Sequence, residues 1–90
     1  MEEFLKKLGI EGDTTTDEDG CLVVNLLDSD DYARAYSKLD KSDLVEEDET
    51  ASQVTLDNSS IQYISEDDKY ILTLLADFDG DVYTLSVRES

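Results

Sequence analysis

The stretch DFDGD, residues 77–81, places three carboxylates at alternate positions around a glycine. This composition occurs in calcium-binding loops, in catalytic carboxylate clusters and in tight turns. In an EF-hand calcium loop that begins at Asp77, position six requires Gly and position twelve requires Glu. The chain has Val82 and Arg88 at those positions. The EF-hand interpretation therefore fails, which leaves at most a weak ion site at the rim of a loop.

The same stretch fits the turn of a β-hairpin. If Asp79 and Gly80 are the two central residues of a type I′ turn, Ala76 faces Tyr83 across the hairpin. This register gathers apolar side chains on one face of the sheet and mixed side chains on the other. A shift by one residue would scramble that separation. The pattern therefore predicts a hairpin over residues 69–89, with a positive φ at Gly80.

Catalytic chemistry has little support in this composition. Glycosidases use two carboxylates, but a chain of 90 residues without Trp offers little room for a sugar cleft. The chain has no His, no Gly-rich phosphate loop and no nucleophile motif. Cys21, the only cysteine, is interpreted as a buried hydrophobic residue, and it forms neither an internal disulfide nor a zinc site. We therefore predict a protein that is not an enzyme and holds no cofactor or metal.

Charge is the dominant feature, because 24 acidic side chains oppose seven basic ones and the formal net charge is −17. Such a chain lacks the basic footprint that nucleic acid requires, and it is repelled by anionic membranes. A small domain needs a net charge of only about 2–8 for solubility. The excess indicates an electropositive partner, and we expect a basic surface on another protein, such as a nucleic-acid-binding groove.

DNA mimicry is a sharper form of this hypothesis, in which carboxylates take the place of phosphates. A globule of this size exposes about 5,300 Å², or roughly 310 Å² per net charge, whereas duplex DNA has one phosphate per roughly 110 Å². Mimicry therefore requires the acids to cluster on one face. Four dense groups are the predicted partner-binding surface: Asp28, Asp30 and Asp31; Glu46, Glu47, Asp48 and Glu49; Glu66, Asp67 and Asp68; Asp77, Asp79 and Asp81. A continuous stripe needs the first two groups to bridge the two ends of the sheet.

Apolar periodicity identifies the elements that must position these acids. It predicts a short helix over residues 2–8 and a longer one over residues 29–39. Residues 11–20 and 44–52 are polar and acidic, and they are predicted to be solvated connections. Alternating apolar residues and short turn-forming segments predict strands at 21–27, 52–56, 61–64, 69–78 and 82–89.

These elements predict an α+β fold for a single domain, residues 1–90. A mainly antiparallel sheet of four or five strands, ending in a C-terminal β-meander, carries one packed helix and the short N-terminal helix. The expected core residues are Phe4, Leu8, Leu22, Val24, Leu26, Tyr32, Tyr36, Leu39, Val54, Leu56, Ile61, Tyr63, Leu72, Leu74, Leu85 and Val87. No apolar run has the length of a membrane span, and none resembles a secretory signal, so we expect a cytoplasmic protein.

In size, acidity and mixed α/β composition, the chain resembles the small acidic proteins that phages and mobile elements use against host DNA-handling enzymes. Those proteins inhibit restriction enzymes, uracil-DNA glycosylase and CRISPR nucleases. The resemblance implies a DNA-mimic inhibitor and assigns no residue roles. The alternative is a regulatory or structural interaction module, or a homodimer, that uses an apolar sheet face while acidity serves solubility. Ile71, Leu75 and Val82, on the second sheet face, favour this alternative.

Overall fold

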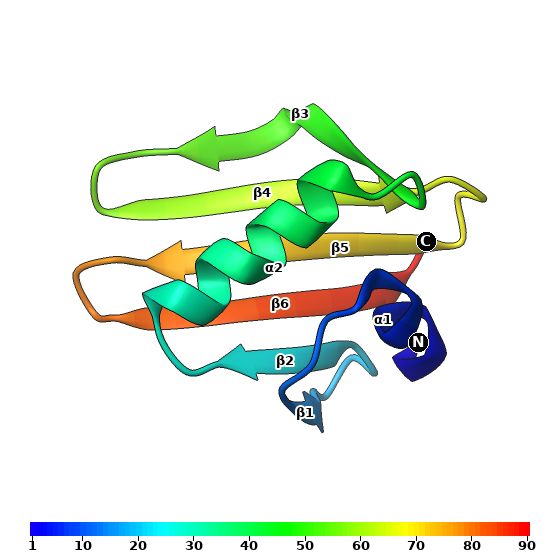
Figure 1. Cartoon of the computed structure of the whole chain (residues 1–90), viewed down its shortest axis with the longest axis horizontal. Helices are drawn as coiled ribbons and strands as arrows, with labels where there is room; N and C mark the ends of the chain where they lie inside the picture. Colours follow the sequence, from blue (N-terminus) through cyan, green and yellow to red (C-terminus); the bar gives the residue numbers. More distant parts are fainter.

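The computed structural model describes residues 1–90 as two helices packed on an antiparallel sheet of six strands (Figure 1). The helices are α1 (Glu2–Leu8) and α2 (Ser29–Lys41). The strands are β1 (Asp13–Thr16), β2 (Leu22–Leu26), β3 (Val45–Val54), β4 (Asn58–Ser65), β5 (Tyr70–Asp77) and β6 (Val82–Glu89). Their order in the sheet is β1-β2-β6-β5-β4-β3. The predicted α+β fold with an antiparallel sheet is confirmed, but the sheet has six strands, not four or five.

Strand β1 accounts for the additional strand. All four of its residues, Asp-Thr-Thr-Thr, are exposed and lie within the stretch 11–20 that was predicted to be a connection. Asp13 pairs with Asn25 and Thr16 pairs with Leu22. The prediction was wrong because it relied on buried apolar residues, whereas an edge strand can form from β-branched Thr and backbone pairing alone.

Strand β3 corrects a second prediction. Glu46–Glu49 were assigned to a solvated loop, but Glu46 pairs with Ile64 and Asp48 pairs with Gln62. The register shifts between Asp48 and Gln53, as at a β-bulge. Acidic side chains and a bulge both protect an edge strand from pairing with other chains. The four acids therefore lie along the edge of the sheet on alternate faces, not in a loop.

The β5–β6 hairpin has the predicted register, with Ala76 opposite Tyr83. Its turn differs from the prediction, because the last pair is Asp77 with Val82 and four residues form the loop. The positive φ falls on Asp81 (55°), not on Gly80. Four-residue hairpin loops are commonly built around a type I turn, and Asp tolerates the left-handed region better than most residues.

The core lies between the helices and one face of the sheet. Its centre is made by β5 and β6, where Leu72, Leu74, Leu85 and Val87 are fully buried. The prediction was correct for these four and for Leu8, Leu22, Val24, Leu26, Leu39, Ile61 and Tyr63. Phe4 and Tyr32 are partly buried and pack against the core.

Three expected core residues are exposed. Val54 is 69% exposed and Leu56 is 98% exposed, because they lie where β3 ends, past its irregular register. Tyr36 lies on α2 and is 37% exposed. Neither helix is long and apolar enough to cross a membrane.

Candidate partner-binding surface

Three connections meet at one end of the sheet, at the left of Figure 1. Tyr83 pairs with both Leu26 and Ala76, so the ends of β2, β6 and β5 are adjacent. The backbone N–H of Phe78 donates to the carbonyl of Asp57 at 2.9 Å, which joins the β5–β6 loop to the β3–β4 loop. We call this region the loop end; it comprises residues 27–31, 54–57 and 77–82.

The loop end concentrates negative charge. It holds seven carboxylates: Asp28, Asp30, Asp31, Asp57, Asp77, Asp79 and Asp81. Arg34 is the only cation beside them, and it forms an ion pair with Asp31. The remaining cations lie in α1, in the C-terminal half of α2 and toward the opposite end of the sheet: Lys6, Lys7, Lys38, Lys41, Lys69 and Arg88. Most of the negative charge at the loop end therefore has no compensating cation.

The start of α2 explains the positions of the first acids. The Asp28 carboxylate accepts a hydrogen bond from the backbone N–H of Asp31 at 2.9 Å and caps the helix. Asp31 in turn accepts from the N–H of Leu27 at 3.3 Å and pairs with Arg34. The hydrogen bond from Arg34 lowers the pKa of Asp31. These two carboxylates therefore hold the β2–α2 connection in place.

The β5–β6 loop uses two of its acids in the same way. Asp77 accepts from the backbone N–H of Gly80 at 3.0 Å, and Asp81 accepts from the hydroxyl of Tyr83 at 2.9 Å. The hydrogen bond to Asp81 raises the pKa of Tyr83, and the charges of Asp28 and Asp77 raise it further. Carboxylates from the β2–α2 connection and from the β5–β6 loop therefore both raise the pKa of one phenol.

Asp30, Asp57 and Asp79 are the free carboxylates of the loop end. All three are exposed, and none of their side chains forms a hydrogen bond or an ion pair within the chain. Asp57 was not among the predicted residues, because it belongs to no dense acidic run and only the contact with Phe78 brings it here. These three residues are the acids most available to a partner.

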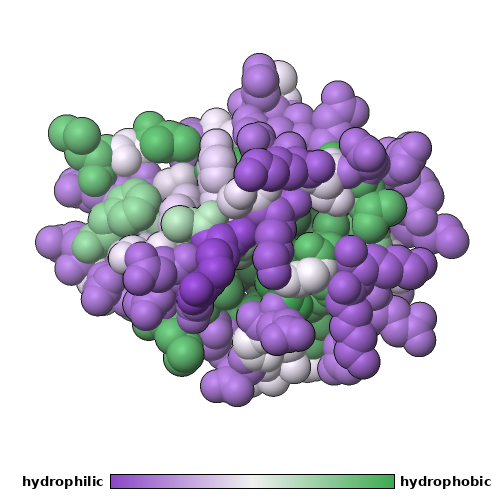
Figure 2. Space-filling view, viewed as in Figure 1, coloured by the Kyte–Doolittle hydropathy of each residue, from purple (hydrophilic) through white to green (hydrophobic).

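Apolar side chains are also exposed at the loop end. Leu27 (80%), Val54 (69%), Leu56 (98%), Phe78 (43%) and Val82 (56%) all belong to it. Figure 2 shows this hydrophobic surface at the left of the molecule, interspersed with hydrophilic residues. Only two other large hydrophobic residues are exposed, Tyr36 and Leu75. The loop end is therefore a mixed surface, acidic and apolar.

A second acidic region lies at the β3 edge of the sheet, and we call it the β3 groove. It is a groove of about 650 Å³, and six acids line it: Asp43, Glu46, Glu47, Asp48, Glu66 and Asp68. Asp67 lies beside it and accepts from the Ser65 hydroxyl at 2.8 Å and from the N–H of Lys69 at 3.1 Å. These hydrogen bonds lower the pKa of Asp67.

The predicted acidic groups thus form two regions. Residues 28–31 join residues 77–81 at the loop end, and residues 46–48 join residues 66–68 at the β3 groove. Residues 50–56 separate the two regions and carry no charge. A continuous stripe is therefore absent along this edge of the sheet.

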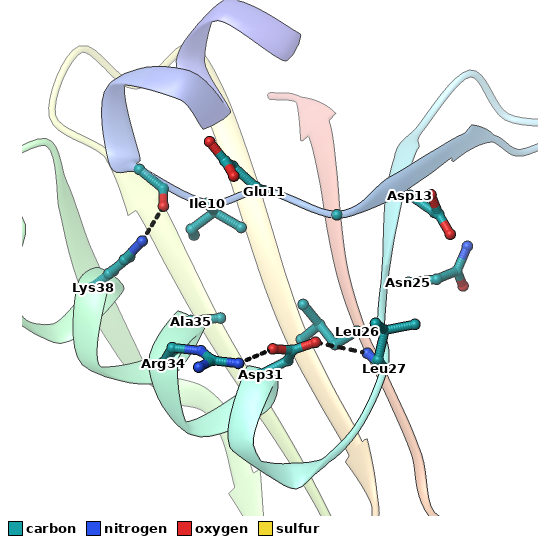
Figure 3. Close-up of a pocket in the computed structure, with 12 residues that line it drawn as sticks. Ile10, Glu11, Asp13, Asn25, Leu26, Leu27, Asp31, Arg34, Ala35 and Lys38 are labelled. Atoms are coloured by element: carbon teal, nitrogen blue, oxygen red, sulfur yellow. Dashed lines mark hydrogen bonds and ion pairs between the residues drawn. The ribbon is translucent and has the colours of Figure 1, made fainter.

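A cleft between the N-terminal segment and α2 is shown in Figure 3. It measures about 460 Å³ and includes Arg34 and Lys38 in its lining. Lys38 donates to the carbonyl of Gly9, and Arg34 pairs with Asp31. Both cations are therefore bound within the chain. The Lys38 hydrogen bond joins the N-terminal segment to α2, and the cleft presents no free cation to a ligand. No three acidic or Cys side chains lie close enough together to hold a metal ion.

Comparison of the chain with protein-family profiles, with curated proteins and with solved structures found no match. The loop end and the β3 groove are therefore the grounds on which a function can be proposed.

Proposed function

We propose that the protein is a non-enzymatic binding protein that occupies a basic surface of another protein. The observation that carries the proposal is the loop end, where seven carboxylates have one cation, Arg34, among them. Seven carboxylates and one cation leave a net charge of −6 there, and exposed charge of this kind gives a basic partner both an orientation and a faster encounter. Solubility alone does not require this amount of charge.

The specific form of the proposal is a DNA mimic that inhibits a DNA-handling enzyme, of the kind that phages and mobile elements encode. The 17 net charges are distributed along a Cα extent of 34 Å. This is about one charge per 2 Å, close to the one per ≈ 1.7 Å of duplex DNA. The exposed surface of 5875 Å² is sparser, at about 350 Å² per net charge, so the contact must use the regions where acids concentrate. A cytoplasmic location agrees with a lone cysteine.

Charge reversal at the loop end tests this proposal. Asp57→Lys with Asp79→Lys removes two free carboxylates without breaking a hydrogen bond. The two changes add four positive units, so the net charge goes from −17 to −13. Glu18→Lys with Glu89→Lys makes the same change at the opposite end of the sheet. The readout is displacement of a labelled duplex from a purified restriction endonuclease, a uracil-DNA glycosylase and a CRISPR nuclease, across a salt titration.

We expect the unmodified protein to displace the duplex from one of these enzymes, with an affinity that falls steeply as salt increases. The loop-end variant should be weaker by about tenfold or more, and the control should change much less. Equal behaviour of the two variants, or no displacement by the unmodified protein at low salt, would contradict the DNA-mimic proposal.

The second candidate function is an interaction module or homodimer that uses the open face of the sheet, the face opposite the helices and the core. Across the four inner strands, two neighbouring cross-strand rows on this face carry no charge: Val23, Ser86, Thr73 and Gln62; Asn25, Thr84, Leu75 and Ser60. At the edge strands the first row ends in Asp48 and the second in Asp13. This uncharged surface is notable in a chain with a net charge of −17. Self-association through this face would be insensitive to salt and lost in Leu75→Ser, which sedimentation equilibrium would measure.

A further inference from the structure

The most exposed apolar residues of the loop end, Leu27 and Leu56, have no role in packing the core. Leu56 is 98% exposed and Leu27 is 80% exposed, so neither contributes appreciable burial to the core. Single exposed apolar residues are common, but five large ones at one end of a small domain indicate an interaction surface. A contact made by charge alone gains nothing from them, so a partner at this end must also present apolar groups.

The dimensions of the loop end fit one element of secondary structure. Its apolar residues lie at the ends of β2, β6, β5, β4 and β3, which are consecutive in the sheet. At about 4.8 Å per strand, the four intervals span roughly 19 Å. A helix covers that distance in about 13 residues, or between three and four turns.

The middle of this surface is preorganised. The Phe78 ring packs against Tyr32 and Tyr83, with centroids 6.0 and 6.1 Å away, and the two tyrosine rings lie 5.4 Å apart. The hydrogen bond from Tyr83 to Asp81 holds this aromatic group against the loop. These aromatic side chains are already ordered in the folded protein. A partner that binds them therefore causes little further loss of side-chain conformational entropy.

Charge complementarity selects the occupant. Asp30, Asp57 and Asp79 lie exposed around the apolar residues and have no partner within the chain. A second copy of the chain would bring seven carboxylates against seven, and anionic lipid or nucleic acid is repelled in the same way. A partner with an apolar stripe flanked by Lys and Arg satisfies both parts of the surface.

We infer that the loop end binds a cationic amphipathic helix of a partner protein. The apolar stripe of the helix packs on Leu27, Phe78 and Leu56, and its basic side chains lie beside the free carboxylates. The inference rests on the proposed function and deepens it. The apolar residues add affinity, and the carboxylates orient the approaching partner. Helices that read the major groove of DNA are one source of such basic surfaces.

Three synthetic peptides of about 18 residues serve as probes. The first is a Leu/Lys amphipathic helix, the second has the same composition in an order that destroys the apolar stripe, and the third is oligolysine of equal charge. Binding is measured by fluorescence anisotropy at low and moderate salt, and the contact is mapped by amide shifts in ¹H–¹⁵N spectra. The protein variants are Leu27→Ser with Leu56→Ser, the charge-reversal pair Asp57→Lys with Asp79→Lys, and the control Leu75→Ser on the open face.

The inference predicts that the amphipathic helix binds at least about tenfold more tightly than the scrambled peptide. Amide shifts should concentrate in residues 27–31, 54–57 and 77–82. The Leu27/Leu56 variant should lose about tenfold in affinity, and Leu75→Ser should lose little. Equal binding of oligolysine, unaffected by the Leu27/Leu56 variant but weakened in the charge-reversal pair, would overturn the inference and leave the proposed function standing. Absence of binding by every cationic peptide at low salt would overturn both.

Discussion

The Asp77 carboxylate accepts a hydrogen bond from the backbone N–H of Gly80 at 3.0 Å, across the β5–β6 loop. With Asp81 bound to the Tyr83 hydroxyl, two of the three acids in DFDGD serve local structure. Only Asp79 has no partner within the chain. The alternation that resembles a calcium loop therefore belongs to a hairpin, whose first and last Asp residues fix its shape.

A double-mutant cycle tests this relationship. Asp77→Ala removes the acceptor of the Gly80 N–H and should lower the free energy of unfolding by about 1 kcal/mol. In Gly80→Ala, the new Cβ would lie 2.9 Å from Asp77 Oδ2 and push the carboxylate out of its hydrogen bond. Gly80→Ala should therefore cost less when Asp77 is already Ala. Urea unfolding of the four proteins measures the coupling, and strictly additive effects would contradict it.

The β5–β6 hairpin and α2 were predictable from the sequence because one buried face determines each. A one-residue slip of the hairpin would expose Leu72, Leu74, Leu85 and Val87 together, so the alternation specifies the register. The spacing of Tyr32, Ala35 and Leu39 defines the helix in the same way.

The edge strands and the composition of the loop end were not predictable by these means. β1 and β3 have little buried side-chain pattern, and they exist because a neighbouring strand supplies hydrogen bonds. Asp57 and Asp79 lie in neighbouring loops only because β4 pairs with β5 in a particular register. Leu56 has the side chain of a core residue, and its exposure depends on where β3 ends. The pairing between strands therefore determines the edge strands, the positions of Asp57 and Asp79, and the exposure of Leu56.

Tyr63 provides a prediction about stability. Its side chain is 1% exposed, and its hydroxyl has no hydrogen-bond partner. Burial raises the pKa of Tyr63 far above its ordinary value, so the phenol stays neutral over the whole range in which the protein is handled. An unpaired buried hydroxyl is unfavourable, and Tyr63→Phe should raise the free energy of unfolding by about 1 kcal/mol.

The matched control is Tyr83→Phe, which removes a hydroxyl that does have a partner, Asp81. This variant should be less stable than the parent, so thermal unfolding should move in opposite directions for the two substitutions. A loss of stability in Tyr63→Phe would indicate that a buried water satisfies the Tyr63 hydroxyl.

Cys21, which was predicted to be buried, is only partly buried, but its thiol should still react slowly. Burial and the negative charges of Asp17 and Asp19 raise the pKa of the thiol. A raised pKa means less thiolate at neutral pH, and the thiolate is the reactive form. Reaction with an aromatic disulfide reagent should therefore be slower in the folded protein than in urea, and it should accelerate as pH rises. Asp19→Asn should speed the reaction at pH 8, whereas Glu18→Gln, which changes a neighbouring acid, should have a smaller effect.

The concentration of charge at the loop end has a consequence for stability that does not depend on any partner. Asp57 and Asp79 make no hydrogen bonds through their side chains, so replacing both with Lys removes repulsion and breaks no hydrogen bond. Melting temperature at low salt should therefore rise. Glu18→Lys with Glu89→Lys changes the net charge equally, but Glu89 follows Arg88 and lies near Lys69, whose carbonyl accepts from the N–H of Ser90. Replacing Glu89 therefore adds repulsion between cations, and the rise should be smaller. At about 1 M salt the Debye length is near 3 Å, and both gains should largely disappear. Equal gains for the two variants at low salt would mean that the negative potential is uniform over the molecule and not concentrated where β2, β3 and β5 end.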